Sequence, residues 1–281
     1  MNKEVAKNIR EGLTADCMRC FGLCCTALNI VASSDFAINK SAGAPCINLQ
    51  GDFRCKIHQN LREKGFKGCT VFDCLGAGQK VSQATFNGQS WKEHPEIANK
   101  MFRVFPVMEQ LYEMIAFIAE ALTYDVAQSL RDKLNKQIEK LQSLTDMDAD
   151  SLLSLDMTSC RFPVNELLLE TSESIRSGLS SKVFAIKKGK KCRGADWIGK
   201  NLVGKDLRTT DLRGAYLIAT DFRNADLRGV DLIGADLRDA NLMGANLSTS
   251  MFLTQMQINS AKGNDKTILP PHIQRPSHWM K

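Results

Sequence analysis

Eight of the ten cysteines lie between Cys17 and Cys74, and this crowding is the feature of the sequence with the clearest chemistry. Thiolates are soft ligands that bind zinc and iron, and eight of them exceed the four that one tetrahedral zinc ion needs. We therefore predict a metal site in this segment. Its ligands are expected to be Cys17, Cys20, Cys24, Cys25, Cys46, Cys55, Cys69 and Cys74.

The number of thiols leaves the metal open. Two closed zinc sites would use all the cysteines, whereas one [4Fe–4S] cluster takes four and leaves the others for a second metal or for reversible chemistry. Cys24 and Cys25 are adjacent and do not easily point at one tetrahedral ion, which favours two metals or the edge of a cluster. We predict iron or an iron–sulfur cluster, with zinc as the alternative and free thiols as the remaining interpretation.

One histidine has ligand-like spacing. His58 lies three residues after Cys55, so both side chains can reach one metal. The simpler interpretation of His58 is a polar surface residue, or one that orients a ligand without binding the metal. Cys160 and Cys192 lie outside the cluster and are interpreted as buried or free thiols.

Over about residues 15–75 the cysteine pattern resembles the family of zinc- or iron-chelating cysteine-cluster proteins. The resemblance implies chelation through the eight cysteines named above. The chain departs from the family pattern in one extra residue before Cys24 and in His58, which stands where the family usually has an aromatic residue. Flagellin lysine N-methylases carry a related cluster on an iron–sulfur centre, so the resemblance admits an iron–sulfur-dependent modifying enzyme.

No motif outside the cysteines predicts catalysis. The sequence has no Gly-x-Ser-x-Gly elbow, no Walker loop and no Gly-x-Gly-x-x-Gly after a strand. Gly76-Ala77-Gly78 indicates a turn that passes close to the metal centre. Any chemistry must come from the metal, and whether the protein is an enzyme stays open.

The sequence repeats with a period of five residues from Ala195 to Thr254. Each quintet has a large apolar residue at its centre and, two positions earlier, a mostly small one, with Asp or Asn usually between them. Neither the helical period nor strand alternation gives five, and a fixed short period is typical of a solenoid whose units bury their apolar sides by stacking. The central residues are Trp197, Leu202, Leu207, Leu212, Leu217, Phe222, Leu227, Leu232, Leu237, Leu242, Leu247 and Phe252.

These quintets resemble the pentapeptide-repeat family. The resemblance implies a right-handed, four-sided β-helix of about three coils. The family includes DNA-mimicking gyrase inhibitors, which are acidic rods, but here eight Asp are balanced by seven Lys and Arg between Ala195 and Thr254. We therefore predict a docking scaffold for a protein partner, expect no nucleic acid or membrane partner, and keep an action on DNA gyrase as an alternative.

The sequence between the two regions is helical in pattern. Apolar residues step by three or four from Ile97 to Leu122 and again from Leu130 to Leu141, which predicts two antiparallel helices. Pro106 is expected to kink or split the first of them. A shorter helix is expected over residues 165–176.

We predict a multi-domain α+β protein. Its expected parts are a Cys-rich metal-binding domain (1–90), a helical segment (91–180), a basic linker (181–194), a pentapeptide-repeat β-helix (195–254) and a C-terminal cap (255–281).

The composition, 43% hydrophobic with a net charge of +6, is that of an ordinary globular protein. No apolar run is long enough to span a membrane, and the charged N-terminus does not resemble a signal peptide. We predict a cytoplasmic protein. Because cytosolic thiols are kept reduced, metal binding is a better interpretation of the cysteines than disulfides.

Overall fold

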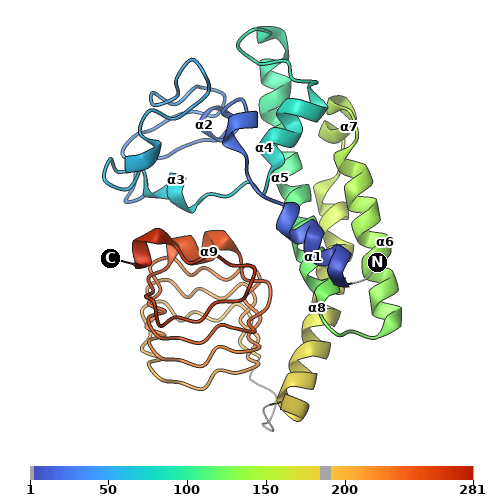
Figure 1. The fold of residues 1–281 in the computed structure, drawn as a ribbon, viewed down its shortest axis with the longest axis vertical. Coiled ribbons are helices and arrows are strands. Elements are labelled where there is room, and N and C mark those ends of the chain that lie inside the picture. Colours follow the sequence, from blue (N-terminus) through green and yellow to red (C-terminus); the bar gives the residue numbers. More distant parts are fainter. Residues whose placement is uncertain (1–2, 184–190, 281) are drawn as a thin grey trace. The chain divides into compact units, whose positions relative to one another are not determined.

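The computed structural model describes residues 3–183 and 191–280, and its regular structure is helical (Figure 1). By its internal contacts the chain divides into two compact units, Met1–Leu168 and Leu169–Lys281. Each is described by itself below. The centre of the predicted basic linker, 181–194, lies outside the described residues.

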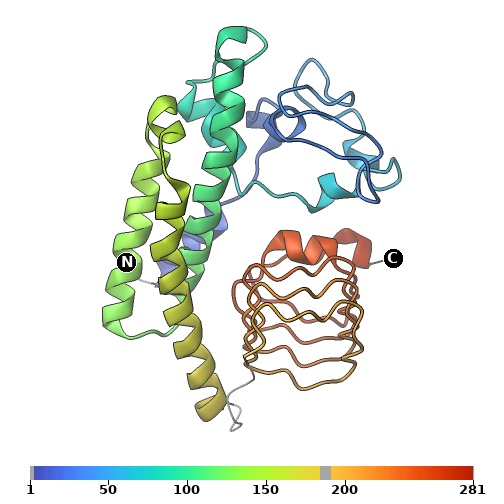
Figure 2. The ribbon, with the colours of Figure 1, turned by 180° about the vertical axis from the view of Figure 1, so that it is seen from behind.

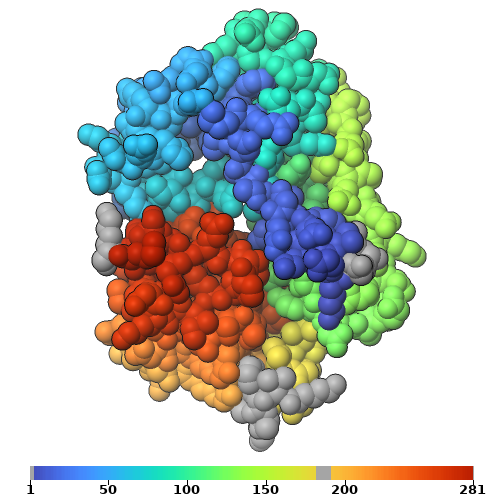
Figure 3. Space-filling model, in the orientation of Figure 1, coloured from blue at the N-terminus to red at the C-terminus, as the bar shows by residue number. Residues whose placement is uncertain are grey.

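A long helix, α5, is the central element of unit 1. Helices α1, α6 and α7 pack against it, and Figure 2 shows α5 and α6 side by side. In the space-filling view, α1 (dark blue) lies against the green helices (Figure 3). The bounds of these helices are α1 Lys3–Gly12, α5 Pro95–Thr123, α6 Gln128–Thr145 and α7 Ala149–Leu153, and α8 follows at Met157–Gly178.

The predicted apolar stripes of the first two long helices are confirmed. The stripe of α5 is buried from Met101 to Leu122, and that of α6 is buried from Leu130 to Leu141. Pro106 lies inside α5 without splitting it, because packing on both sides of the proline holds the helix together. α8 is longer than the helix that was predicted over 165–176.

The cysteine-rich segment of unit 1 has little regular structure. Its short helices are α2 (Leu23–Ala27), α3 (Lys67–Val71) and α4 (Ala77–Lys80), joined by long irregular stretches. Two isolated antiparallel bridges pair Ile30 with Lys40 and Leu49 with Cys55. Few apolar side chains here are buried, namely those of Leu23, Ala27, Ile30, Cys46, Leu61, Phe66 and, in α4, Ala77.

Aromatic side chains attach this segment to the start of α5. The ring of Phe53 contacts those of Phe21 and Trp91, with centroid distances of 5.2 and 5.6 Å, and Trp91 in turn contacts Phe102. The indole N–H of Trp91 donates a 2.7 Å hydrogen bond to the carbonyl of Phe21. The cysteines are therefore held on a rigid support although their own segment is irregular.

In unit 2 the quintets wind into stacked coils that repeat every 20 residues. Residues one coil apart form parallel bridges, as Asp211 does with Asp231. The stack extends beyond the quintets on both sides, since the bridges begin at Lys191 and the last one joins Asn246 to Ile268.

The prediction of an α+β protein with a β-helix of about three coils is wrong. Among the described residues there is no β-strand or sheet, because each pairing in the stack is an isolated bridge. Within each quintet a turn separates one bridge from the next, closed by bonds such as Thr210 N–H to Leu207 C=O at 3.1 Å. The turn includes a position with positive φ, for example Gly214. Consecutive residues of one coil therefore do not form a continuous ladder of hydrogen bonds with the next coil, as the residues of a β-strand do with a neighbouring strand.

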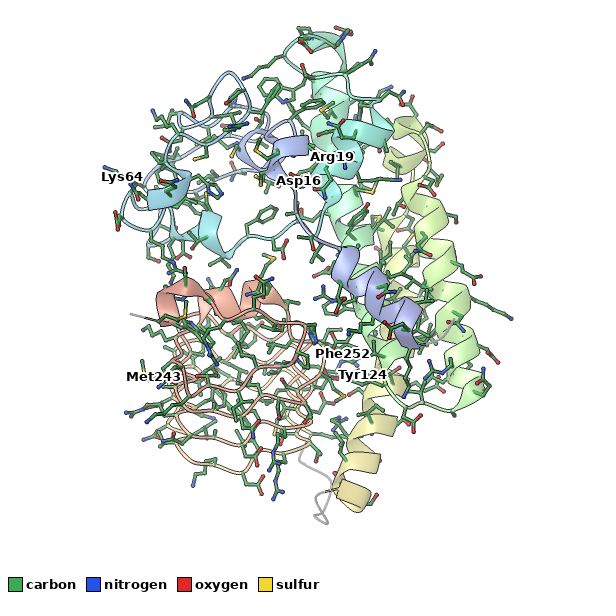
Figure 4. All side chains as sticks on the ribbon, viewed as in Figure 1. Asp16, Arg19, Lys64, Tyr124, Met243 and Phe252 are labelled. Atoms are coloured by element: carbon green, nitrogen blue, oxygen red, sulfur yellow. The ribbon has the colours of Figure 1, made fainter. Side chains whose placement is uncertain are left out.

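The side chains of the stack point as the repeat predicted. The central residues from Leu212 onward are buried, and Trp197, Leu202 and Leu207 are partly buried against the same core. Phe252 is enclosed whereas Met243 is 40% exposed, and Figure 4 labels both. The five-residue period thus fixes which side chains enter the core.

The C-terminal residues complete the core of the stack at its far end. Helix α9 (Gln255–Ser260) begins at a capping box on Thr254 and contributes Ile258 to the core. Trp279 is 4% exposed, and its indole N–H donates to the carbonyl of Ala261 at 3.0 Å.

Unit 2 also buries an arginine of α8. Arg176 is fully buried and donates to the Thr209 carbonyl at 3.2 Å and to Ser172 Oγ at 3.1 Å. Its guanidinium also lies 2.8 Å from Glu173 and 3.5 Å from Asp211. These contacts fix the C-terminal half of α8 against the coils.

No helix in the described ranges is long and apolar enough to cross a membrane.

Candidate metal centre

All ten cysteines are free thiols, and the eight of the opening segment fall into two groups. The first group gathers around Gly78. A Cβ built on Gly78 would lie 2.7 Å from Cys20 Sγ and 3.8 Å from Cys74 Sγ. Cys17 and Cys20 act electrostatically on Cys24, and Cys74 acts on both Cys17 and Cys20. We call Cys17, Cys20, Cys24 and Cys74 the outer quartet.

The other four cysteines form a second group in a small apolar cluster. Cys25, Cys46, Cys55 and Cys69 pack together around Leu61 and Phe66. Burial, together with the charges of the other three thiols, raises the pKa of Cys69 to about 12. We call these four cysteines the inner quartet.

The adjacent cysteines Cys24 and Cys25 join the two quartets. Their sulfur atoms lie 3.9 Å apart. The hydrogen bond between them raises the pKa of Cys24 and lowers that of Cys25. Cys25 also lies within electrostatic range of Cys17, so the quartets are neighbours. Apart from this pair, Cys24 has its sulfur neighbours mainly in the outer quartet. Cys25 has its own mainly in the inner quartet.

Backbone N–H groups point at several of these sulfurs. Cys46 Sγ accepts from the N–H of Asn48 at 3.5 Å. Burial raises the pKa of Cys20 to about 11, and the N–H of Leu23 opposes that shift. Burial likewise raises the pKa of Cys74, opposed by the N–H of Gly78. Such donors stabilise the ionised sulfur, which is the form that binds a metal.

A buried lysine lies beside the inner quartet. Lys40 is only 7% exposed, and its ammonium donates to backbone carbonyls, including those of Thr26 and Ala44. Burial lowers the pKa of Lys40, and the thiols of Cys46 and Cys25 oppose this shift.

Acidic and phenolic groups lie beside the outer quartet. Asp16 and Asp73 act on Cys17, and Glu109 of α5 acts on Cys74. Figure 4 labels Asp16 and Arg19 at the start of this segment. Burial raises the pKa of Tyr112 to about 12, with smaller contributions from Asp146 and then Cys74.

Within the described ranges, no three His, Cys, Asp or Glu side chains converge closely enough to hold a metal ion as they stand. The donor set nevertheless fits metals that prefer sulfur, because the thiols form two groups of four with backbone donors aimed at them. His58 is exposed, in the 3-10 turn His58–Asn60. Cys160 belongs to α8 and Cys192 packs in the repeat stack.

Sequence reasoning missed Lys40 and Glu109. Lys40 stands among polar loop residues, and Glu109 follows a buried methionine in the stripe of α5. Neither position has a neighbour in the sequence that indicates the burial of Lys40 or the partial burial of Glu109. Only the fold brings them to the thiols.

Glu109 gives a prediction about pH. Burial, with a smaller contribution from Glu113, raises the pKa of Glu109 from 4.5 to about 7. The folded chain therefore binds an extra proton between these values, and the stability falls as the pH rises through this window. We expect Glu109→Gln to leave the free energy of unfolding unchanged near pH 4 and to raise it by about 1–3 kcal/mol at pH 8.

Urea unfolding at a series of pH values would measure this effect. Glu139→Gln, at an exposed position of α6, is the matched control and should change stability equally little at every pH. A Glu109→Gln profile parallel to that of the wild type would show that the Glu109 carboxyl is not buried as described.

The chain is 54% identical over 272 residues to the uncharacterized protein YybG of Bacillus subtilis (strain 168), an alignment that covers 97% of this chain and 96% of YybG. The chain belongs to the YybG family. Because so few residues fall outside the alignment, the match to YybG spans both the cysteine-rich segment and the repeats. A family model for pentapeptide repeats (8 copies) matches residues 191–229 and 210–248 of this chain, which lie within the coil stack.

Two solved structures are similar to part of this member of the YybG family. One is alr5209, a pentapeptide repeat protein from Nostoc Pcc 7120, at 28% identity over 31% of this chain and 78% of that chain, with a TM-score of 0.17. The other is AT2G44920, a pentapeptide repeat protein from the Arabidopsis thaliana thylakoid lumen, at 30% identity over 30% of this chain and 60% of that chain, with a TM-score of 0.15.

Proposed function

We propose that this protein binds two metal ions, one in each cysteine quartet, and that its repeat stack is a docking scaffold for a protein partner. The observation that carries the metal proposal is the sorting of eight free thiols into two groups of four. The resemblance of the cysteine spacing to chelating cysteine-cluster proteins supports the same function.

The weak apolar core of the segment also supports metal binding. The three fully packed residues of its inner cluster are Cys46, Leu61 and Phe66, and one of them is itself a proposed ligand. A segment with so little buried apolar surface and so little regular structure needs another source of stability. Metal ions bound by four side chains each would supply it.

The grouping favours single ions over clusters. A [4Fe–4S] cluster in each quartet would place two bulky centres side by side, yet Cys24 Sγ and Cys25 Sγ are only 3.9 Å apart. Zinc is the ion that most often takes a closed shell of four thiolates. We therefore propose zinc in both quartets, with mononuclear iron as the alternative, which reverses the order predicted from the sequence.

Metal and sulfide analysis of anaerobically purified protein tests this proposal. We expect about two zinc ions per chain and no acid-labile sulfide. Cys24→Ser in the outer quartet and Cys46→Ser in the inner quartet should each reduce the content to about one ion. Cys160→Ser, in α8, is the control and should keep both. A folded, metal-free chain with all its thiols titratable would overturn the proposal.

The same preparation separates the alternative functions. An iron–sulfur-dependent modifying enzyme, related to the flagellin lysine N-methylases, requires acid-labile sulfide and binding of S-adenosylmethionine. An effector of DNA gyrase requires a change in supercoiling by purified gyrase. The repeat surface does not favour gyrase, because arginines such as Arg223 and Arg238 are paired within their own quintets to Asp221 and Asp236.

A further inference from the structure

We propose that Lys40 is the counter-charge of the inner quartet, so that this quartet holds its metal ion more tightly than the outer quartet does. The inference rests on the proposed function, because it assigns to one residue the difference between the two sites. Lys40 acts here as a positioning residue and not as a metal ligand.

The ammonium of Lys40 is fixed in place by the backbone around it. It donates to the carbonyls of Thr26 at 3.0 Å, Ser41 at 3.1 Å and Ala44 at 2.9 Å, and also to that of Leu28. These carbonyls take up its hydrogen-bonding capacity, and they fold the chain around the end of α2. The charge therefore has a defined position beside the residues that follow Cys25.

Hydrogen bonds to carbonyls do not neutralise this charge. In the part of the chain that the structure describes, no Asp or Glu pairs with Lys40, and the ionisable groups that act on it are Cys46, Cys25 and Cys24. A buried ammonium without an anion nearby is costly. A zinc ion with four thiolates carries a net charge of −2, from +2 and four times −1, and would be the missing anion.

The outer quartet has the opposite surroundings. Among the largest electrostatic influences on Cys17 and Cys74 are other cysteines and the carboxyl groups of Asp16, Asp73 and Glu109, and each of these raises the pKa of the cysteine on which it acts. Cys17 is also exposed, whereas Cys46 is buried. A centre with a net negative charge is therefore opposed by its neighbours in the outer quartet and balanced by Lys40 in the inner one.

Variants of Lys40 in single-site backgrounds test this difference. The Cys24→Ser chain keeps the inner site and the Cys46→Ser chain keeps the outer site. Zinc affinity is measured in each by competition with a chromophoric chelator, after the metal content of the wild type has been established. Lys40→Gln removes the charge and keeps an amide donor, Lys40→Met removes both, and Lys40→Arg keeps the charge.

We expect Lys40→Gln and Lys40→Met to weaken zinc binding by about 10–100-fold at the inner site. The loss at the outer site should be much smaller, because among the outer cysteines Lys40 acts only on Cys24, and more weakly than on Cys46 and Cys25. Lys40→Arg should stay within a few-fold of the parent, and the pH at which half the zinc is released should rise only in the two uncharged variants. Lys64→Met, at an exposed lysine of the same segment, is the control and should change neither site.

Three results would overturn the role of Lys40. Wild-type affinity in Lys40→Gln would show that the charge is irrelevant. An equal loss in Lys40→Arg and Lys40→Gln would show that Lys40 acts by packing alone, and an equal loss at both sites would show a general effect on folding. A wild-type chain that holds no metal would overturn the proposed function itself, and the initial metal analysis would reveal this.

Discussion

Replacing Arg176 with methionine is expected to destabilise the repeat stack by about 3–5 kcal/mol. The guanidinium is fully buried and donates to the Thr209 carbonyl and Ser172, with Asp211 beside it. Methionine has a similar length but no donor. The Thr209 carbonyl would lose this hydrogen bond, and the buried Asp211 carboxylate would lose the adjacent positive charge and keep the N–H of Arg213. Asp231, in the next coil, is a second buried acid, and burial raises its pKa. The interior around Arg176 therefore already opposes negative charge, and an Asp211 carboxylate without Arg176 would add to that cost.

Hydrogen–deuterium exchange of peptides from the coils would measure this loss, because backbone N–H groups of one coil donate hydrogen bonds to carbonyl groups of the next coil. The matched control is Arg223→Met. Arg223 pairs with Asp221 at 2.7 Å but its side chain is 51% exposed, and removal of such a solvent-screened pair changes stability little. Equal protection in the two variants would contradict the buried role of Arg176.

Metal removal is expected to unfold the segment from Cys17 to Cys74 and to leave the repeat stack folded. The segment has few buried apolar side chains and its helices are single turns. The energy of the proposed metal binding, about 10–16 kcal/mol for structural zinc, would therefore be largely its folding energy. The stack has its own continuous core from Leu212 to Leu253. The two regions should therefore respond differently to a chelator.

Exchange experiments with and without a zinc chelator would check this expectation under reducing conditions. Peptides from the cysteine segment should lose protection, whereas peptides from residues 212–253 should not. The Cys160→Ser chain provides a control for thiol chemistry outside the quartets. Unchanged protection of the cysteine segment after complete metal removal would contradict the expectation.

The interior of the stack could be predicted from the sequence, but its secondary structure could not. A period of five is enough to place Leu212 and Ala215 in the core, because inward positions must recur at the same point of each quintet. It does not show how many residues of a quintet pair with the next coil, and here the turns leave isolated bridges. The burial of Arg176 was also hidden, because an arginine in the last turn of a helix usually lies in solvent.

The thiols of the candidate site could be predicted as a set, but not their grouping. Spacing alone shows that Cys24 and Cys25 cannot easily share an ion, without showing which later cysteine joins which of them. That depends on the long irregular path between Ile30 and Phe66, where sequence periodicity gives no guide. Lys40 approaches the thiols through its pairing with Ile30, a contact set by the tertiary fold.

The order of the cysteines along the chain has a consequence for metal loading. Every proposed inner ligand lies between Cys24 and Cys74, so the loop that an inner ion would close is nested within the loop that an outer ion would close. Closing a loop costs conformational entropy that grows with its length, and either ion, once bound, shortens the chain that remains to be closed. By loop entropy alone, each of the two proposed ions would therefore assist the other. Chains with a single ion would then be under-represented during titration, to the extent that this gain exceeds the repulsion between the two negatively charged centres.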